Sequence, residues 1–237
     1  MAARTLLALA LLGCNADPGH PDQGVTYRDG NGDMGSSGER GNVRVSEIHW
    51  AGSVTDDGKW DPTDQFIELR NEGNRPVDIT GWLLRIRGGV WVTLKLPGLE
   101  DGRMLIPGEH VYFATKSTGC FPEPDGLLPD LAFVYGEPVS VTLQDLDEHL
   151  IDGAGSYEVA PYAGGYDLVD ARSMEKVEIM FGGRGFEPES WHYYSRIEVD
   201  IPNNDRVAEG CRLHTQASPG RPNSPDYSGA YTTGAFE

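Results

Sequence analysis

Short runs in which apolar and polar residues alternate recur from about residue 43 onward, and each predicts a β-strand. Such strands are expected over residues 43–50, 66–70, 77–86, 90–96, 110–114, 139–143, 151–152, 174–181 and 190–195. No window of 15 residues shows a convincing helical period. The chain also holds 31 Gly and 16 Pro, which fits many short strands joined by turns. We therefore predict an all-β fold, and the regular strand spacing favours a β-sandwich.

The most informative stretch is residues 64–84, which has the pattern of a strand, a polar turn and a second strand. The turn contains Asn71-Glu-Gly-Asn74, which is favourable turn chemistry. Near the end of the stretch, Gly81 lets the backbone bend before Trp82. We expect the Trp82 ring to fill the core, because a large aromatic side chain buries much apolar area.

Two glutamates sit beside apolar positions of predicted strands. Ile67 and Leu69 alternate with residues that include Glu68, so the two sets should face opposite sides of a sheet. Glu175 has a similar setting in a later strand. We expect Glu68 and Glu175 to pair with arginine or to cap loop amides rather than to serve as functional carboxylates.

The amino terminus has the features of an export signal. A short basic start is followed by the apolar run of residues 6–12, which is too short for the roughly 20 residues that span a bilayer. The run ends in Leu11-Leu-Gly-Cys14, which resembles the lipobox of bacterial lipoproteins. The resemblance implies cleavage before Cys14 and a stable lipid anchor on this cysteine. Ordinary secretion, with a chance cysteine near the cleavage site, is the alternative.

The domain organisation follows from this reading. Residues 1–13 are the predicted lipoprotein signal peptide, and residues 14–42 form a flexible, acidic, Gly-rich tether. Residues 43–224 form the folded domain, and 225–237 a tail. Asn15, where an inner-membrane retention signal would have Asp, favours the outer membrane by resemblance to lipoproteins.

Two cysteines remain after Cys14, namely Cys120 and Cys211. An even pair in an exported chain predicts a disulfide, because the compartment is oxidising. Two separate buried thiols are the alternative, since sequence does not give their distance apart.

Several motifs resemble, in the right order, those of the lamin tail domain, which also occurs in exported bacterial proteins. They are Val45-Ser-Glu-Ile48, Phe66-Ile-Glu-Leu-Arg-Asn71, Val77-Asp-Ile-Thr-Gly-Trp82, Leu105-Ile-Pro-Gly-Glu109, the pair Val141-Thr-Leu143 and Leu150-Ile-Asp152, Ser173-Met-Glu-Lys176, and Ser218-Pro-Gly-Arg-Pro-Asn223. The chain departs from the family pattern at Phe66, Met174 and Lys176 and around residues 153–170. The resemblance implies an immunoglobulin-like β-sandwich used for binding or scaffolding, with no fixed ligand.

Charge and motifs narrow the function further. The chain has 37 Asp+Glu against 19 Lys+Arg, a formal net charge of −18, which repels phosphate backbones. We therefore expect no nucleic-acid partner. The sequence has no nucleophile elbow, zincin motif or phosphate-binding glycine loop, and its six histidines lack zinc-site spacing. We predict a protein that is not an enzyme and has no catalytic residues.

Acidic clusters are weak candidates for calcium. The stretch Asp29-Gly-Asn-Gly-Asp33 begins like a calcium loop but then departs from the pattern at its sixth and twelfth positions. The candidates retained for a metal are Asp56, Asp57, Asp61 and Asp64, although a solvated acidic loop is favoured. A third cluster, Asp145, Asp147 and Glu148, is expected at an exposed hairpin tip.

Aromatic residues near loops are candidates for sugar stacking, although core packing is favoured for most of them. The candidates are Trp60, Trp91 and the run Trp191-His-Tyr-Tyr194. The sequence thus predicts a non-enzymatic, envelope-anchored lipoprotein that binds an envelope protein or a glycan. A calcium- or glycan-binding extracellular module that accompanies a secreted hydrolase is the alternative.

Overall fold

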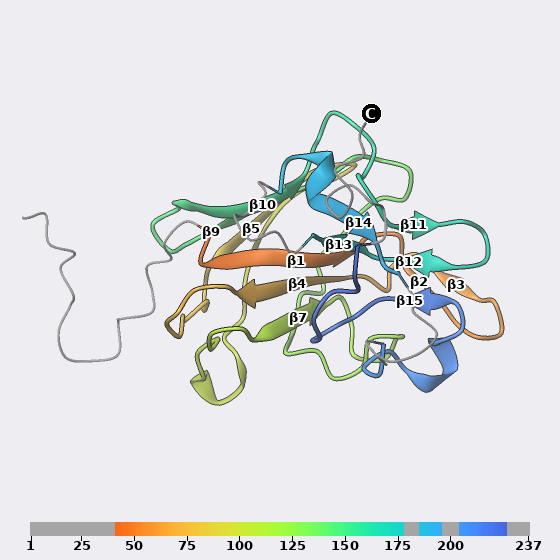
Figure 1. Cartoon of the computed structure of the whole chain (residues 1–237), viewed down its shortest axis with the longest axis horizontal. Coiled ribbons are helices and arrows are strands. Elements are labelled where there is room, and N and C mark those ends of the chain that lie inside the picture. Colours follow the sequence, from red (N-terminus) through yellow and green to blue (C-terminus); the bar gives the residue numbers. More distant parts are fainter. Residues whose placement is uncertain (1–40, 178–184, 196–203, 227–237) are drawn as a thin grey trace, which may run out of the picture. The chain divides into compact units, whose positions relative to one another are not determined.

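The computed structural model describes residues 41–177, 185–195 and 204–226, all within the compact unit Met34–Glu237 (Figure 1). The signal peptide, Cys14, the tether up to residue 40, Asp29, Asp33 and most of the tail lie outside the described residues, as does much of the strand predicted over 174–181. The described segments contain β-strands and short 3-10 helices but no α-helix, so the fold is all-β as predicted. Within these segments no helix has the length and apolarity to cross a membrane.

The largest sheet has six strands in the order β14-β13-β1-β4-β7-β8. Their bounds are Trp191–Tyr193, Met174–Lys176, Val43–His49, Phe66–Asn71, His110–Ala114 and Gly126–Leu127. The central strands β1, β4 and β7 are antiparallel neighbours and lie side by side in Figure 1. A register shift between Val45 and Glu47 marks a bulge in β1.

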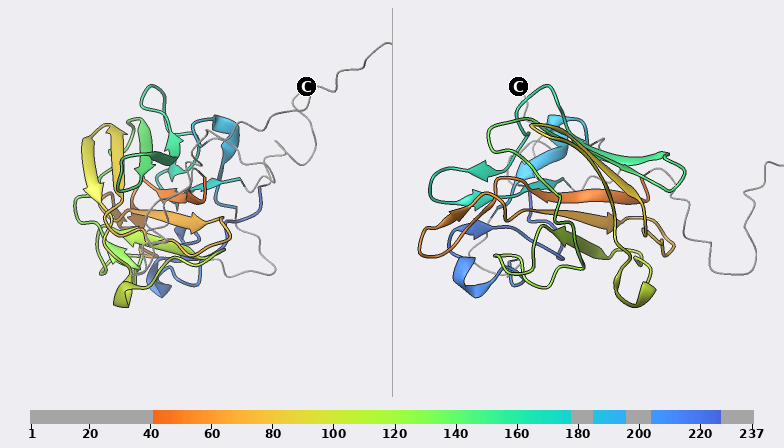
Figure 2. Two further views of the ribbon diagram at one scale, coloured as in Figure 1. Left: turned by 90° about the vertical axis from the view of Figure 1, so that its left-hand side faces the viewer. Right: turned by 180° about the vertical axis from the view of Figure 1, so that it is seen from behind.

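A second sheet has four antiparallel strands in the order β10-β9-β5-β6, and Figure 2 gives two further views of both sheets. Its strands are Leu150–Gly155, Val139–Gln144, Leu83–Gly88 and Trp91–Lys95. Two small sheets complete the topology. One joins β11 (Gly165–Tyr166), β12 (Ala171–Arg172) and β15 (Thr215–Gln216), and the other joins β2 (Ser53–Val54) to β3 (Trp60–Asp61). The 3-10 helices are η2 (Glu100–Gly102), η3 (Pro188–Ser190) and η4 (Glu209–Cys211).

One buried cluster draws apolar side chains from both large sheets. Ile67 and Leu69 of β4 belong to it, together with Leu84 and Ile86 of β5. Trp82 is completely buried in the same cluster, as predicted. Its neighbour Gly81 has a φ of +77°, the left-handed conformation that glycine adopts without strain.

The opposite face of the six-stranded sheet is also covered. Phe66 and Tyr112 point to this side, because they alternate with the core residues of β4 and β7. They form a second buried cluster with Phe121, Val207 and the two cysteines, so the later part of the chain packs here. Both faces of this sheet are therefore buried, and polar residues along its strands become buried with it.

The predicted strand over residues 77–86 is wrong in its first half. Residues 77–82 form one isolated bridge, between Val77 and Leu105, and a turn, and β5 begins only at Leu83. The two strands of the stretch 64–84 also lie in different sheets, because β4 pairs with β1 and β7 whereas β5 pairs with β6 and β9. The turn between them carries the chain from one sheet to the other, which an alternation pattern alone does not reveal.

Candidate functional site

Three glutamates form a row across the six-stranded sheet, on the face opposite the main core. Glu47 of β1 is the cross-strand partner of both Glu175 of β13 and Glu68 of β4. All three are completely buried. Buried carboxylates require hydrogen-bond donors, because an unpaired charge in a low-dielectric interior is strongly unfavourable.

The segment after β15 supplies most of these donors. The Ser218 amide donates to Glu47 Oε1 at 2.9 Å, and the Gly220 amide donates to Glu68 Oε2 at 2.6 Å. The Ser224 amide donates to Glu175 Oε2 at 3.0 Å. The row therefore fixes the path of residues 218–224 across the sheet, and we name this stretch the C-terminal strap.

Two glutamates of the row have raised pKa values. Burial, with added repulsion from the neighbouring glutamates, raises the pKa of Glu47 well above its usual value. Burial likewise raises the pKa of Glu175, to about 7. The Ser218 hydroxyl contacts both carboxyl groups, yet it carries a single proton, so one carboxyl group must donate the second hydrogen. This arrangement suits a structural role, in which the glutamates hold the strap against the sheet. Capping of loop amides was one of the two roles expected for Glu68 and Glu175.

Other residues of the sequence motifs join the same framework. The Asn71 side chain donates to the carbonyls of Arg75 and Leu105 and so closes the turn after β4. The Asn223 side chain ties the strap to the carbonyls of Ser46 and Lys176. These polar side chains hold turns and strand ends together, which is an architectural role.

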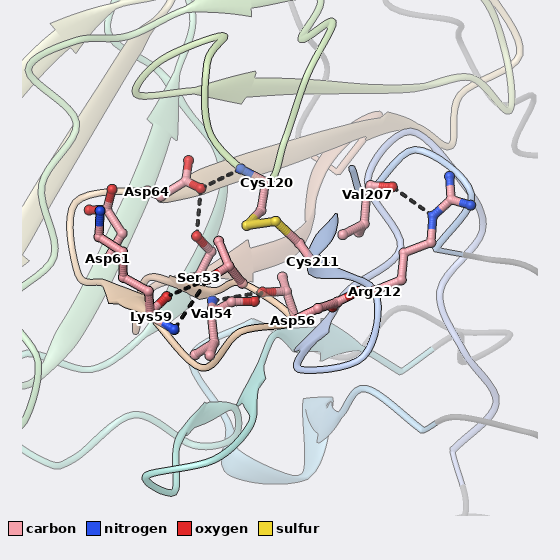
Figure 3. Close-up of a disulfide and its surroundings, with 12 residues drawn as sticks. Ser53, Val54, Asp56, Lys59, Asp61, Asp64, Cys120, Val207, Cys211 and Arg212 are labelled. Carbon is pink, nitrogen blue, oxygen red and sulfur yellow. Dashed lines mark hydrogen bonds between the residues drawn. A yellow bond between two sulfur atoms is a disulfide. The ribbon is translucent and has the colours of Figure 1, made fainter. Parts of the chain in front are cut away.

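A disulfide links Cys120 to Cys211, with a Cα–Cα distance of 5.7 Å, as predicted (Figure 3). It connects the loop after β7 with helix η4, which are 91 residues apart in the sequence. Both cysteines are buried in the second cluster, against aromatic residues such as Phe121. The bond therefore attaches the last part of the described chain to the six-stranded sheet.

The four aspartates predicted as a weak metal site serve separate local roles. Three of them, Asp56, Asp61 and Asp64, are seen near this disulfide in Figure 3. Asp56 accepts the Leu213 amide at 2.9 Å, and the Asp57 carboxylate accepts the Thr55 hydroxyl. Asp61 pairs with Lys116 at 2.5 Å. These contacts tie neighbouring loops together.

Asp64 is the one of the four that is fully buried. Its Oδ2 accepts the Ser53 hydroxyl at 2.5 Å and the Cys120 amide at 2.6 Å, while burial raises its pKa. A Cβ on Gly119 would lie 2.1 Å from Asp64 Oδ1, so a larger residue at that position would displace the Asp64 carboxylate. Asp64 thus holds the backbone next to the disulfide.

The part of the chain that the structure describes brings one set of three metal-type side chains together, namely Asp145, Asp147 and His149. They lie at the turn between β9 and β10, where sequence reasoning placed an exposed hairpin tip. Asp145 Oδ1 accepts the amides of the other two residues, which is the usual bonding of an Asx turn. Glu148, the third residue predicted for this cluster, pairs with Arg85 instead. The turn geometry accounts for the cluster without a metal.

An aromatic cluster lies where β3 and β11 meet. Trp60 stacks on Tyr166 at 4.7 Å between ring centroids, with planes 14° apart. Tyr135 meets Trp60 edge-on at 72° and stacks on Trp50 at 6.0 Å. The rings thus form two roughly perpendicular walls.

A cleft of about 430 Å³ opens beside these walls. Its lining includes Tyr135, Tyr166 and Tyr193 together with the charged residues Asp170 and Arg172. The volume falls in the roughly 300–1,000 Å³ range of small-ligand sites. Its exposed tyrosine rings stand beside charged side chains, a composition suited to contact with a ligand, and we name it the aromatic cleft.

The sequence anticipated this cleft only in part. Of the predicted sugar-stacking residues, Trp60 supports a wall and Tyr193 lines the cleft, whereas Trp191 and Tyr194 are buried. Trp91 is exposed on β6, where Arg87 lies over its ring at 5.5 Å, and it is not part of the lining. Tyr135 and Tyr166 come from irregular stretches that gave no sequence signal.

Comparison with known proteins gives no assignment: no family model matches this chain, and no curated protein matches it.

Proposed function

We propose that the protein is an exported, lipid-anchored binding module without enzymatic activity, built on an immunoglobulin-like β-sandwich of the lamin-tail type. The observation that carries this proposal is the convergence of the sequence motifs in space. Glu47, Glu68 and Glu175 come from three motifs, and the strap that caps them comes from a fourth. Because residues of four separate motifs meet in one hydrogen-bond network, the network supports the proposal that this chain shares its architecture with the family whose motifs it resembles.

The distribution of polar groups favours binding over catalysis. The three buried glutamates are engaged with the strap, and the acidic loop bonds its own neighbours. The aromatic cleft instead combines exposed rings with charged side chains, which is the composition of a recognition site. The net charge of −18 argues against nucleic acid as the ligand. The partner is therefore an envelope protein or a glycan.

The anchor assigned to Cys14 is tested by metabolic labelling with radioactive palmitate. We expect the wild-type protein to be labelled and to fractionate with the outer membrane, and Cys14→Ala to lose the label. Asn15→Asp is the matched control, which should keep the label but move the protein to the inner membrane. Equal labelling of Cys14→Ala and wild type would refute the anchor.

A glycan-binding module that accompanies a secreted hydrolase is the second candidate, and the aromatic cleft is the observation that favours it. Calcium lacks comparable support, because Asp61 is paired with Lys116 and Asp56 holds a loop amide. Enzyme partnership would appear as co-purification of a hydrolase with the anchored protein.

A further inference from the structure

We propose that the aromatic cleft binds an uncharged pyranose unit of a glycan chain. This inference rests on the proposed role as a binding module and names the ligand of that module. It draws on the arrangement of the rings, on the polar groups beside them, and on the charge of the cleft.

The rings give the cleft stacking surfaces. Tyr135 is 45% exposed and Tyr193 is 54% exposed, and both line the cleft. A pyranose ring has one face of C–H groups that packs on the electron-rich face of an aromatic ring, and its hydroxyls project from the rim. Flat aromatic side chains with few rotatable bonds suit this contact, because little conformational entropy is lost on binding.

Internal hydrogen bonds hold the walls in place before any ligand arrives. The Tyr135 hydroxyl donates to the Tyr166 carbonyl at 2.7 Å. The indole N–H of Trp50 donates to the Ala163 carbonyl at 2.9 Å, and that of Trp60 donates to the Ala51 carbonyl at 2.9 Å. A pre-organised site avoids the cost of ordering side chains during binding.

Polar groups on the hairpin between β11 and β12 are also fixed. Asp167 Oδ1 accepts the amides of Val169 and Asp170, which leaves its Oδ2 without a hydrogen bond to any described residue. Asp170 is held by His214 at 2.8 Å and lies 3.7 Å from the Arg172 guanidinium. Carboxylate and guanidinium groups accept from and donate to sugar hydroxyls in fixed directions.

The charge of the cleft selects among glycans. Two carboxylates and one guanidinium line it, in a chain with a net charge of −18. An anionic sugar would be repelled by this field, whereas an uncharged sugar would not. The cleft is therefore matched to neutral glycans rather than to uronic or sialic acids.

Affinity electrophoresis tests the proposal on the full chain carrying Cys14→Ala, which lacks the proposed acylation site. Native gels contain galactomannan, xylan or a soluble β-glucan, with polygalacturonate as the anionic comparison. We expect retardation by at least one neutral polysaccharide and none by polygalacturonate. Tyr193→Ala and Tyr135→Ala should each weaken binding about tenfold, the size expected for loss of one aromatic contact.

Two variants control for the fold and for the hydroxyl group. Tyr157→Ala removes an exposed ring outside the cleft lining and should bind like the parent. Tyr193→Phe keeps the ring and should retain most of the affinity. Unchanged melting temperatures would show that all variants are folded.

The glycan assignment is overturned if no neutral polysaccharide retards the protein, or if Tyr193→Ala binds as tightly as Tyr157→Ala. Quenching of tryptophan fluorescence by tetramethylammonium, without retardation by any polysaccharide, would assign the cleft to a cation instead. These outcomes leave the lipid anchor untouched, because palmitate labelling of Cys14 tests it separately. Equal palmitate labelling of wild type and Cys14→Ala, with intact polysaccharide binding, would overturn the anchor alone.

Discussion

Removal of the Cys120–Cys211 bond should destabilise the domain strongly. The double variant Cys120→Ala/Cys211→Ala deletes the bond without leaving a free thiol in the second cluster. The cross-link spans 91 residues, and the chain-entropy relation for a loop of that length gives about 15 cal/mol/K of lost denatured-state entropy. This corresponds to about 5 kcal/mol at 25 °C, an upper figure because the denatured chain retains some structure.

Urea denaturation followed by tryptophan fluorescence measures this effect. With a denaturant slope of about 2 kcal/mol/M, the midpoint of the double variant should lie up to about 2.5 M below that of the oxidised protein. Wild type unfolded in the presence of dithiothreitol should match the double variant, and dithiothreitol should not change the variant itself.

A free energy of unfolding of the double variant within about 1 kcal/mol of that of the oxidised wild type would refute this role of the disulfide. Such a result would mean that the strap and the second cluster hold the later part of the chain without help from the cross-link.

Three further predictions concern the core, the acid row and the acidic loop. Trp82→Ala should lower the free energy of unfolding by about 3–5 kcal/mol, and Trp82→Phe should lower it clearly less. If both variants lowered the melting temperature by the same small amount, Trp82 would not be a core residue. Because the folded pKa values of Glu47 and Glu175 exceed the unfolded value, the folded state binds more protons, and stability should fall as the pH rises from about 4.5 to about 7. Urea titrations across that range should show a weaker dependence of stability on pH for Glu175→Gln, and an unchanged dependence would count against the raised pKa of Glu175. The melting temperature should be the same in millimolar calcium and in chelator, since Lys116 already pairs with Asp61. A clear rise of the melting temperature with calcium would support the acidic loop as a metal site.

Strand prediction succeeded where local alternation and tertiary packing agree. Residues 110–114 form β7 with the predicted bounds, because Val111 and Phe113 face the core while the residues between them face the other side. The prediction over residues 77–86 failed, since the left-handed Gly81 and the change of sheet interrupt a stretch that reads as continuous. Alternation reports which side of a strand is apolar and carries no information about which sheet the strand joins.

The candidate site was much harder to predict than the strands. Tyr135 and Tyr166 are 31 residues apart, and each lies in a stretch without periodic pattern. Only the folding of several loops around one small sheet brings these rings together. Similarly, the capping of Glu47 by Ser218 is set by the path of the strap, which has no local sequence signature beyond its turn residues.

The strap has a consequence for how the molecule is made. Ser218 bonds Glu47 across 171 residues, and Asn223 reaches Ser46 across 177. Contacts at such sequence separation form late and slowly, because closing the long loop between the two residues costs conformational entropy. Glu47 in the first strand of the domain therefore lacks its contact with the strap until residues 218–224 have emerged during synthesis. A chain that stops before residue 218 would expose that acid row, and we expect such a fragment to be recognised as unfinished and degraded rather than to persist as a partial domain.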